Sequence, residues 1–171
     1  MFGKKASPEP QQAQYPVLVL TPDYLIEGMT APVKNLHFTI FTSGDGYGSI
    51  QSTMITDAHF QPIGPHDSPS RDAQTFMAHG DQIIAQIPKT GAPINTYDYW
   101  KEHKKPLAGT FYIGPFLFTG TMMLLNDEIM DLHMPMVDVT ISSARSGDKF
   151  GGISAPFAIV NTFWMIGYEP L

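Results

Sequence analysis

The chain has 171 residues, a formal net charge of −6 and no cysteine, which excludes disulfide frameworks, thiolate zinc sites and cysteine nucleophiles. A negative charge with only two arginines, Arg71 and Arg145, disfavours a nucleic-acid binder and DNA above all, because basic groups supply most non-specific affinity for phosphates. Fifteen glycines and 15 prolines favour a turn-rich, all-β protein over a helical one.

Residues 1–14 are rich in proline, glutamine and small side chains, and this composition predicts a disordered tail. No basic segment followed by an apolar run opens the chain, and no later apolar stretch approaches about 18 uninterrupted residues. We therefore expect a cytoplasmic protein that does not enter a membrane.

The next segments predict short strands. Residues 15–20 and 24–27 are apolar runs separated by the turn sequence Thr21-Pro22-Asp23, which predicts a hairpin, and Gly28 marks a bend or bulge after it. Residues 36–41 and 49–60 predict further strands. Three prolines then predict a loop from 61 to about 73.

Two stretches, residues 77–88 and 159–170, resemble each other. Each reads as two short apolar strands around a tight polar turn, Gly80-Asp81 in the first and Asn161-Thr162 in the second. Each is closed by a proline, which cannot donate to a sheet ladder. We expect each stretch to form the closing pair of strands of a small β unit.

Between these units, residues 89–106 predict a linker with a short helix. Asn95 or Thr96 can cap the helix, and lysines lie near its end, where they suit the helix dipole. We expect Lys101, Lys104 and Lys105 to form a solvated last turn.

The two halves of the chain contain matching landmarks. Gly28 and Gly120 are 92 positions apart, Asp57 and Asp138 are 81 apart, and Pro88 and Pro170 are 82 apart. A tandem duplication with about eleven extra residues in the first copy accounts for all three coincidences.

The order within each copy resembles the Sm/LSm family of small, open, five-stranded barrels of the SH3-like type. In that family a strand ends in glycine, a later strand carries an acid, and the closing motif contains Arg-Gly followed by Asp or Asn. Residues 77–87 are similar to that motif, with His79 in the place of the arginine; in the second copy, Asn161-Thr162 replaces the Arg-Gly pair. The resemblance implies two tandem small open barrels, residues 15–88 and 107–171, joined by a short helix.

The resemblance also implies assembly into rings by edge-to-edge strand pairing, and RNA binding in the ring lumen. The family's RNA-gripping Asp-x-apolar-x-Asn segment has no convincing counterpart in the first copy, and Asn126-Asp127-Glu128 in the second adds negative charge. We therefore expect a non-enzymatic, ring-forming Sm-like scaffold or assembly protein. The alternative is an RNA-binding Sm-like protein with His79, Gly80 and Asn161 as lumen residues.

A third possibility is a metal-dependent enzyme that uses Asp57 and His59. These residues lie two apart in a predicted strand and hence on the same face, and carboxylate and imidazole can bind zinc, nickel or iron. No acid and histidine have a diagnostic spacing, and the second copy has Thr140 where the first has His59. We expect solvated or satisfied histidines without metal or cofactor, and repeated acids, Asp57 and Asp138, that bond backbone donors at a turn or bulge.

Two segments have a superficial likeness to catalytic loops. Residues 44–48 are rich in glycine but lack the Gly-Lys-Ser/Thr ending of a phosphate-binding loop. Residues 142–148 lack the Gly-x-Ser-x-Gly elbow of a hydrolase. We expect both to be hairpin connections.

Overall fold

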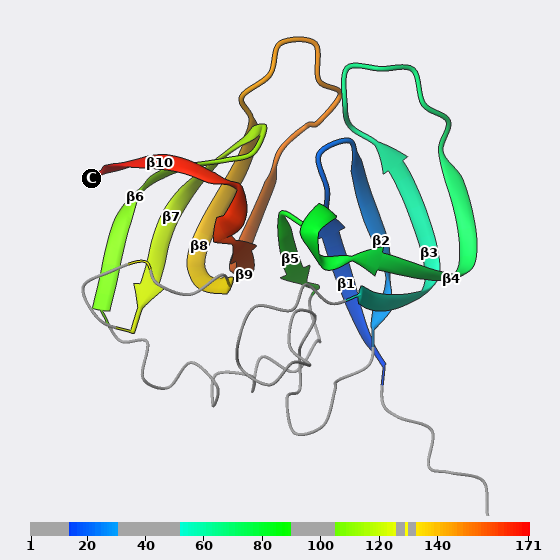
Figure 1. Ribbon diagram of the computed structural model, residues 1–171, viewed down its shortest axis with the longest axis horizontal. Helices are drawn as coiled ribbons and strands as arrows, with labels where there is room; N and C mark the ends of the chain where they lie inside the picture. Colours follow the sequence, from blue (N-terminus) through cyan, green and yellow to red (C-terminus); the bar gives the residue numbers. More distant parts are fainter. Residues whose placement is uncertain (1–13, 31–51, 90–104, 126–128, 130–132) are drawn as a thin grey trace, which may run out of the picture.

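The computed structural model describes residues 14–30, 52–89, 105–125, 129 and 133–171. The ten described strands form one large open antiparallel sheet in the order β10-β6-β7-β8-β9-β5-β1-β2-β3-β4 (Figure 1), so the all-β prediction is confirmed. Two single turns of 3₁₀ helix, Gly80–Gln82 and Thr162–Trp164, interrupt the strands. The strands are β1 (Tyr15–Leu20), β2 (Tyr24–Thr30), β3 (Ser52–Pro62), β4 (Arg71–His79), β5 (Ala85–Pro88), β6 (Lys105–Ile113), β7 (Phe116–Leu124), β8 (His133–Ser143), β9 (Ile153–Asn161) and β10 (Met165–Pro170).

The strands form where apolar residues alternate with polar ones around turn sequences. On β7, Phe116, Phe118 and Met122 are buried while the residues between them are more exposed, as expected of a strand with one face on the core. The predicted first hairpin is confirmed: Thr21 N–H donates to the carbonyl of Tyr24 at 2.9 Å and closes the turn between β1 and β2. Local pattern and turn chemistry thus place β1, β2 and most of β3 correctly.

Two bulges bend the sheet at the predicted landmarks. The register of β2 on β3 shifts at Gly28, opposite Asp57, and the register of β7 on β8 shifts at Gly120, opposite Asp138. Asp57 and Asp138 have φ of 49° and 51°, in the left-handed region that Asp tolerates better than most residues. The prediction of a bulge at Gly28 is therefore confirmed, and both repeated acids lie at bulges.

The sheet consists of two halves with the same internal order, β5-β1-β2-β3-β4 and β10-β6-β7-β8-β9. Their pairings also agree in register, so each strand position in the first half has a matched position in the second. Matched positions are 92 residues apart for β1 and β2, 81 for β3, and 82 from β4 to β5. Each cross-strand pair of the first half therefore corresponds to one of the second half. The pair Leu20↔Ala85 corresponds to Tyr112↔Gly167, Glu27↔His59 to Thr119↔Thr140, and Ala58↔Ala73 to Val139↔Ala155.

The closing strands of each half are not hairpins, which corrects the prediction for residues 77–88 and 159–170. β4 pairs with β3 and β5 pairs with β1, with the 3₁₀ turn at Gly80 carrying the chain from one side of the half to the other. A two-residue hairpin of the favoured types needs positive φ at its first central residue, and Gly80 does not have it. The buried Ile83 and Ile84 after the turn hold the chain against the core instead.

Other expectations are corrected in extent or fall outside the described residues. β3 continues to Pro62 and β4 begins at Arg71, so the predicted loop from 61 to 73 is shorter, and Lys105 and Pro106 begin β6 rather than end a helix. Four predictions fall outside the described residues: the tail at 1–14 apart from Gln14, the strand at 36–41, the connection at 44–48 and the rest of the linker helix.

Two hydrophobic clusters fill the two halves. One consists mainly of β6 to β9 residues and includes Phe111, Phe116 and Phe118; the other consists mainly of β1 to β4 residues and includes Phe60. The middle strands link the two clusters: Ala85 of β5 belongs to the β6 to β9 cluster, while β9 contributes Val160 to that cluster and Ile159 to the β1 to β4 cluster. Figure 1 shows each half curling on its own side of β5 and β9.

Candidate functional site

The two halves meet where β5 pairs with β9, here called the internal junction. The register has two pairs, Ala85↔Val160 and Gln86↔Ile159, and Asn161 N–H extends it by donating to the Ile84 carbonyl at 2.8 Å. All six residues are buried. The junction is therefore a short but dry strand pairing.

Two side chains, one at the end of β9 and one in the turn that follows it, fix the internal junction to the first 3₁₀ turn. The amide of Asn161 donates to the carbonyls of Gly80 at 3.3 Å and Ile83 at 3.0 Å, and its Oδ1 accepts from Phe163 N–H at 3.0 Å. The indole N–H of Trp164 donates to the carbonyl of Asp81 at 2.9 Å. Because buried carbonyls need donors, these bonds satisfy backbone groups that the strand ladder leaves open.

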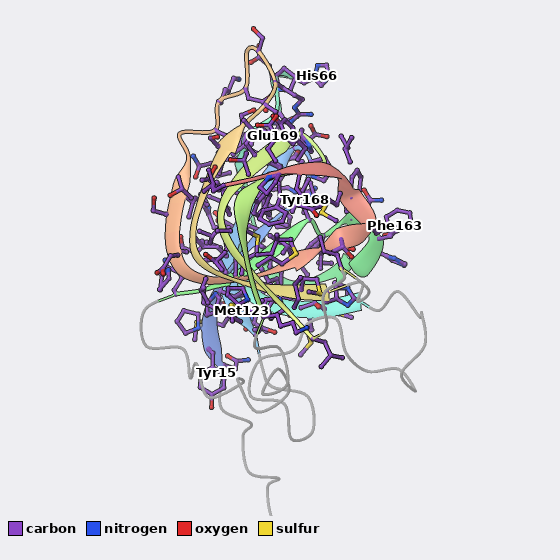
Figure 2. The ribbon with its side chains drawn as sticks, turned by 90° about the vertical axis from the view of Figure 1, so that its left-hand side faces the viewer. Tyr15, His66, Met123, Phe163, Tyr168 and Glu169 are labelled. Carbon is purple, nitrogen blue, oxygen red and sulfur yellow. The ribbon has the colours of Figure 1, made fainter. Side chains whose placement is uncertain are left out.

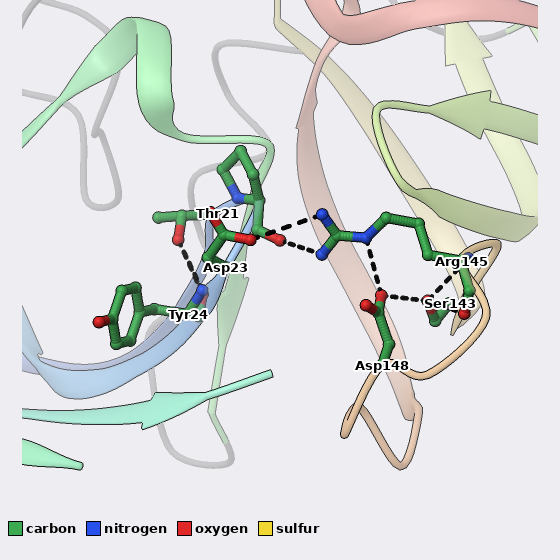
Figure 3. A network of polar contacts seen from close by, with 7 residues as sticks. Thr21, Asp23, Tyr24, Ser143, Arg145 and Asp148 are labelled. Carbon is green, nitrogen blue, oxygen red and sulfur yellow. Dashed lines mark hydrogen bonds and ion pairs between the residues drawn. The ribbon is translucent and has the colours of Figure 1, made fainter. Parts of the chain in front are cut away.

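A loop between β8 and β9 reaches the turn between β1 and β2 in the first half (Figure 3). Arg145 donates to the Pro22 carbonyl at 2.6 Å and lies 3.5 Å from a carboxylate oxygen of Asp23. Its Nε donates at 3.0 Å to Asp148, whose side chain is 1% exposed and also accepts from the hydroxyl of Ser143. This network holds the connection at residues 144–152 against the turn between β1 and β2.

The same connection makes a second, solvated contact with the first half. Lys149 N–H donates to the Ile63 carbonyl at 3.0 Å, and its ammonium lies 2.6 Å from a carboxylate oxygen of Asp67. The hydrogen bond and the charge of Lys149 lower the pKa of the Asp67 carboxyl below its ordinary value. The predicted hairpin connection at residues 142–148 is confirmed as the link between β8 and β9, but it covers 144–152, because β8 extends to Ser143. Arg145 is a contact residue that sequence reasoning missed.

The outer strands β4 and β10, here called the free edges, have no strand partner on their outer sides within the described residues. Met54 and Met77 pair across β3 and β4 and are 48% and 55% exposed. Ile166 on β10 is 81% exposed, Tyr168 is 45% exposed, and Phe163 in the preceding turn projects from the ribbon in Figure 2. Both free edges thus combine unpaired backbone with exposed apolar side chains, a combination that favours pairing with another strand.

The predicted lumen residues have different environments. Gly80 and Asn161 are buried and bonded to each other across the internal junction. His79 is exposed, and its Nδ1 lies 3.2 Å from a carboxylate oxygen of Asp81. The structure brings all three to the 3₁₀ turns, but the polar atoms of the Asn161 side chain are engaged with the backbone.

The predicted metal candidates, Asp57 and His59, both lie on β3. Asp57 and His59 are both exposed on β3, but the Nδ1 of His59 bonds the cross-strand Asp72 at 2.6 Å. Among the described residues, no group of three histidine, aspartate or glutamate side chains could hold a metal ion. His59 is thus half of a polar cross-strand pair on the outer face of the sheet.

No family model matches the chain, and neither the curated proteins nor the solved structures contain a match. In the part of the chain that the structure describes, no helix has the length and apolar character required to cross a membrane.

Proposed function

We propose that this protein is a non-enzymatic scaffold that assembles into a closed ring of identical copies, each built from two Sm-like units in tandem. The agreement of strand order and register between the two halves supports the tandem arrangement. In this proposal the β10 edge of one copy pairs with the β4 edge of the next. β10 matches β5 and β4 matches β9, so the contact between copies repeats the internal junction.

One observation carries the proposal: matched positions are buried at the internal junction and exposed at the free edges. Ile159 is 1% exposed within the cluster of the first half, whereas the matched Met77 is 55% exposed. Ile84 is fully buried, with its side chain beside Gly114 and Trp164 of the second half, whereas the matched Ile166 is 81% exposed. The free edges therefore carry the apolar groups that a second junction would bury.

The internal junction specifies the register between copies. Its pair Gln86↔Ile159 becomes Tyr168 opposite Met77 of the next copy, and Ala85↔Val160 becomes Gly167 opposite Ala78. Such a contact is head-to-tail, because the two surfaces differ, and repeated head-to-tail contacts close into a ring when the rotation per copy allows it.

The alternative expectation of RNA binding has less support. The Asn161 amide bonds two backbone carbonyls, and the chain is acidic overall. Because RNA affinity depends on neutralising phosphates, a ring of such copies needs a basic lumen that no observation supplies. The scaffold is the function that the geometry favours.

The test is native mass spectrometry of the untagged full chain, purified without nuclease, together with edge variants. We expect the wild type to form one closed multiple of 18.9 kDa. Ile166→Asp blocks the β10 edge and Met77→Asp blocks the β4 edge, so each is expected to be a monomer. Mixing the two is expected to give a one-to-one dimer, because one intact edge of each kind remains.

Leu125→Asp is the matched control, since Leu125 is also an exposed apolar residue but lies just after β7, away from both free edges. It is expected to assemble like the wild type. A monomeric wild type, or edge variants that assemble normally, would overturn the proposal. A mixture of blocked variants that stays monomeric would refute the head-to-tail pairing, and nucleotides carried by the ring would favour the RNA-binding alternative.

A further inference from the structure

His79 and Asn161 occupy matched positions. Each ends a strand, β4 or β9, and each directly precedes a 3₁₀ turn with extended backbone angles, φ and ψ of −77° and 130° for His79 and −88° and 104° for Asn161. Asn161 lies at the internal junction, whereas His79 lies at the end of the free edge β4. The residue type at this position is therefore a chemical difference between the internal junction and its proposed copy.

At the internal junction this position supplies hydrogen bonds across the contact. The Asn161 amide donates to the carbonyls of Gly80 and Ile83 in the other half. The carbonyls at the matched positions of the neighbouring copy belong to Thr162 and Met165. A carbonyl oxygen has two lone pairs, so each can accept a bond in addition to any within its own turn.

His79 can replace Asn161 as a hydrogen-bond donor better when its imidazole is protonated than when the ring is neutral. Its Nδ1 faces the Asp81 carboxylate, so the neutral ring has its single N–H occupied there and presents a bare lone pair at Nε2. A bare lone pair opposite carbonyl oxygens makes no bond. The protonated ring has N–H groups at both nitrogens, and can bond Asp81 and a carbonyl of the neighbouring copy together.

We propose that His79 closes the contact between copies in the place that Asn161 has at the internal junction, and that protonation of its imidazole strengthens assembly. This inference rests on the proposed head-to-tail scaffold. It makes assembly tighter as pH falls through the range from about 8 to about 6, in which histidine side chains change charge.

The other groups that face His79 do not reverse the expected direction of the pH dependence of assembly. Asp81, in the same 3₁₀ turn, carries the carboxylate that lies 3.2 Å from Nδ1 of His79, and position 52 opposite His79 on β3 is a serine. On the neighbouring copy, residues 162–167 have no ionisable side chain. The next acid along β10, Glu169, accepts the Tyr112 hydroxyl at 2.7 Å, a bond that raises the pKa of the phenol.

The experiment measures the dissociation constant between full-length copies by sedimentation velocity at pH about 6 and about 8. We expect wild-type assembly to be at least about fivefold tighter at the lower pH, because a hydrogen bond from a charged donor is gained. His79→Asn restores the residue of the internal junction, so it is expected to assemble at both pH values with less than about twofold difference.

His79→Gln keeps an amide and serves as a second variant, expected to behave like His79→Asn. His66→Asn is the matched control, because His66 is an exposed histidine in the connection between β3 and β4, away from the free edges. It should keep the wild-type pH dependence. Because His66→Asn and His79→Asn each lose one histidine, comparing them accounts for the general effect of a smaller negative net charge at lower pH, which promotes association of any acidic protein.

The outcomes separate the two proposals. The role of His79 is overturned if assembly still depends on pH in both His79 variants, or if the wild type assembles equally at both pH values. Either result leaves the scaffold proposal intact. A wild type that assembles at neither pH refutes the scaffold and the inference with it.

Discussion

Gln86 is a single residue whose burial is at odds with its chemistry. It lies fully buried in β5 between Val19 and Ile159, and within the described part of the chain neither side-chain amide atom has a hydrogen-bond partner. An unpaired buried polar group costs about 1 to 3 kcal/mol of stability. At the free edge the matched residue is Tyr168. Its ring stacks on Phe111, and the residue is 45% exposed to solvent.

We expect Gln86→Met, which keeps the shape of the side chain and removes the unpaired amide, to raise the free energy of unfolding by about 1 to 2 kcal/mol. Urea denaturation measures the change. Gln74→Met, at an exposed position of β4, is the control and should change the free energy by less than about 0.5 kcal/mol. A decrease in stability for Gln86→Met would show that the amide has a partner in solution.

At the scale of elements, the two bulges bend β2 against β3 and β7 against β8 and require close backbone approach. A Cβ on Gly28 would lie 2.4 Å from the Cγ2 of Ile55 and 2.8 Å from the Thr56 carbonyl oxygen. On Gly120 it would lie 2.9 Å from the Asp138 carbonyl oxygen. Glycine is therefore required by the approach of the opposing strand at both bulges.

Gly28→Ala is expected to lower the free energy of unfolding by about 2 kcal/mol or more, because the added methyl group overlaps the backbone of β3. Thermal and urea unfolding give the measurement. The matched control is Gly151→Ala, where an added Cβ meets no atom within 4 Å and φ is not positive, and its effect should stay within about 1 kcal/mol. Equal effects of the two substitutions would contradict the argument.

At the scale of the whole molecule, the strand pairing between the two halves has only two residue pairs, so polar contacts between the halves add to their stability. Arg145 bridges the halves by bonding both Pro22 and the buried Asp148 (Figure 3). The exposed pair of Lys149 and Asp67 lies beside it, where solvent screens the attraction. The guanidinium is the stronger of the two links because it also neutralises a buried carboxylate.

Arg145→Ala is expected to cost about 3 kcal/mol of folding stability, since it leaves the Asp148 carboxylate buried without its cation. Adding Asp148→Asn to that variant should recover part of the loss, because a neutral amide is cheaper to bury. Lys149→Met is the control and should cost less than about 1 kcal/mol. No recovery in the double variant would mean that the contact with Pro22, and not the ion pair, carries the effect.

Much of the fold could be predicted from the sequence, and the misses follow from one cause. The turn at Thr21, the bulge at Gly28 and the apolar alternation of the strands depend on neighbours within a few residues, so a local pattern indicates them. The hairpin prediction for the chain after His79 was wrong because a polar turn between apolar runs is typical of a hairpin as well as of the 3₁₀ turn found there. Of the candidate site, the sequence indicated Gly80 and Asn161, but it gave no signal for Arg145 beyond its being one of two arginines.

The sequence by itself determined the β class, the turns and the landmarks at Gly28, Asp57, Gly120 and Asp138, because these depend on residue type and short-range spacing. Tertiary structure alone decided that β5 pairs with β9, that Asn161 bonds Gly80 across 81 residues, and that Arg145 bonds Pro22 across 123. It also decided which edges remain open. Such contacts are set by how two curled halves bury apolar surface against each other, and no short stretch of the chain encodes that geometry.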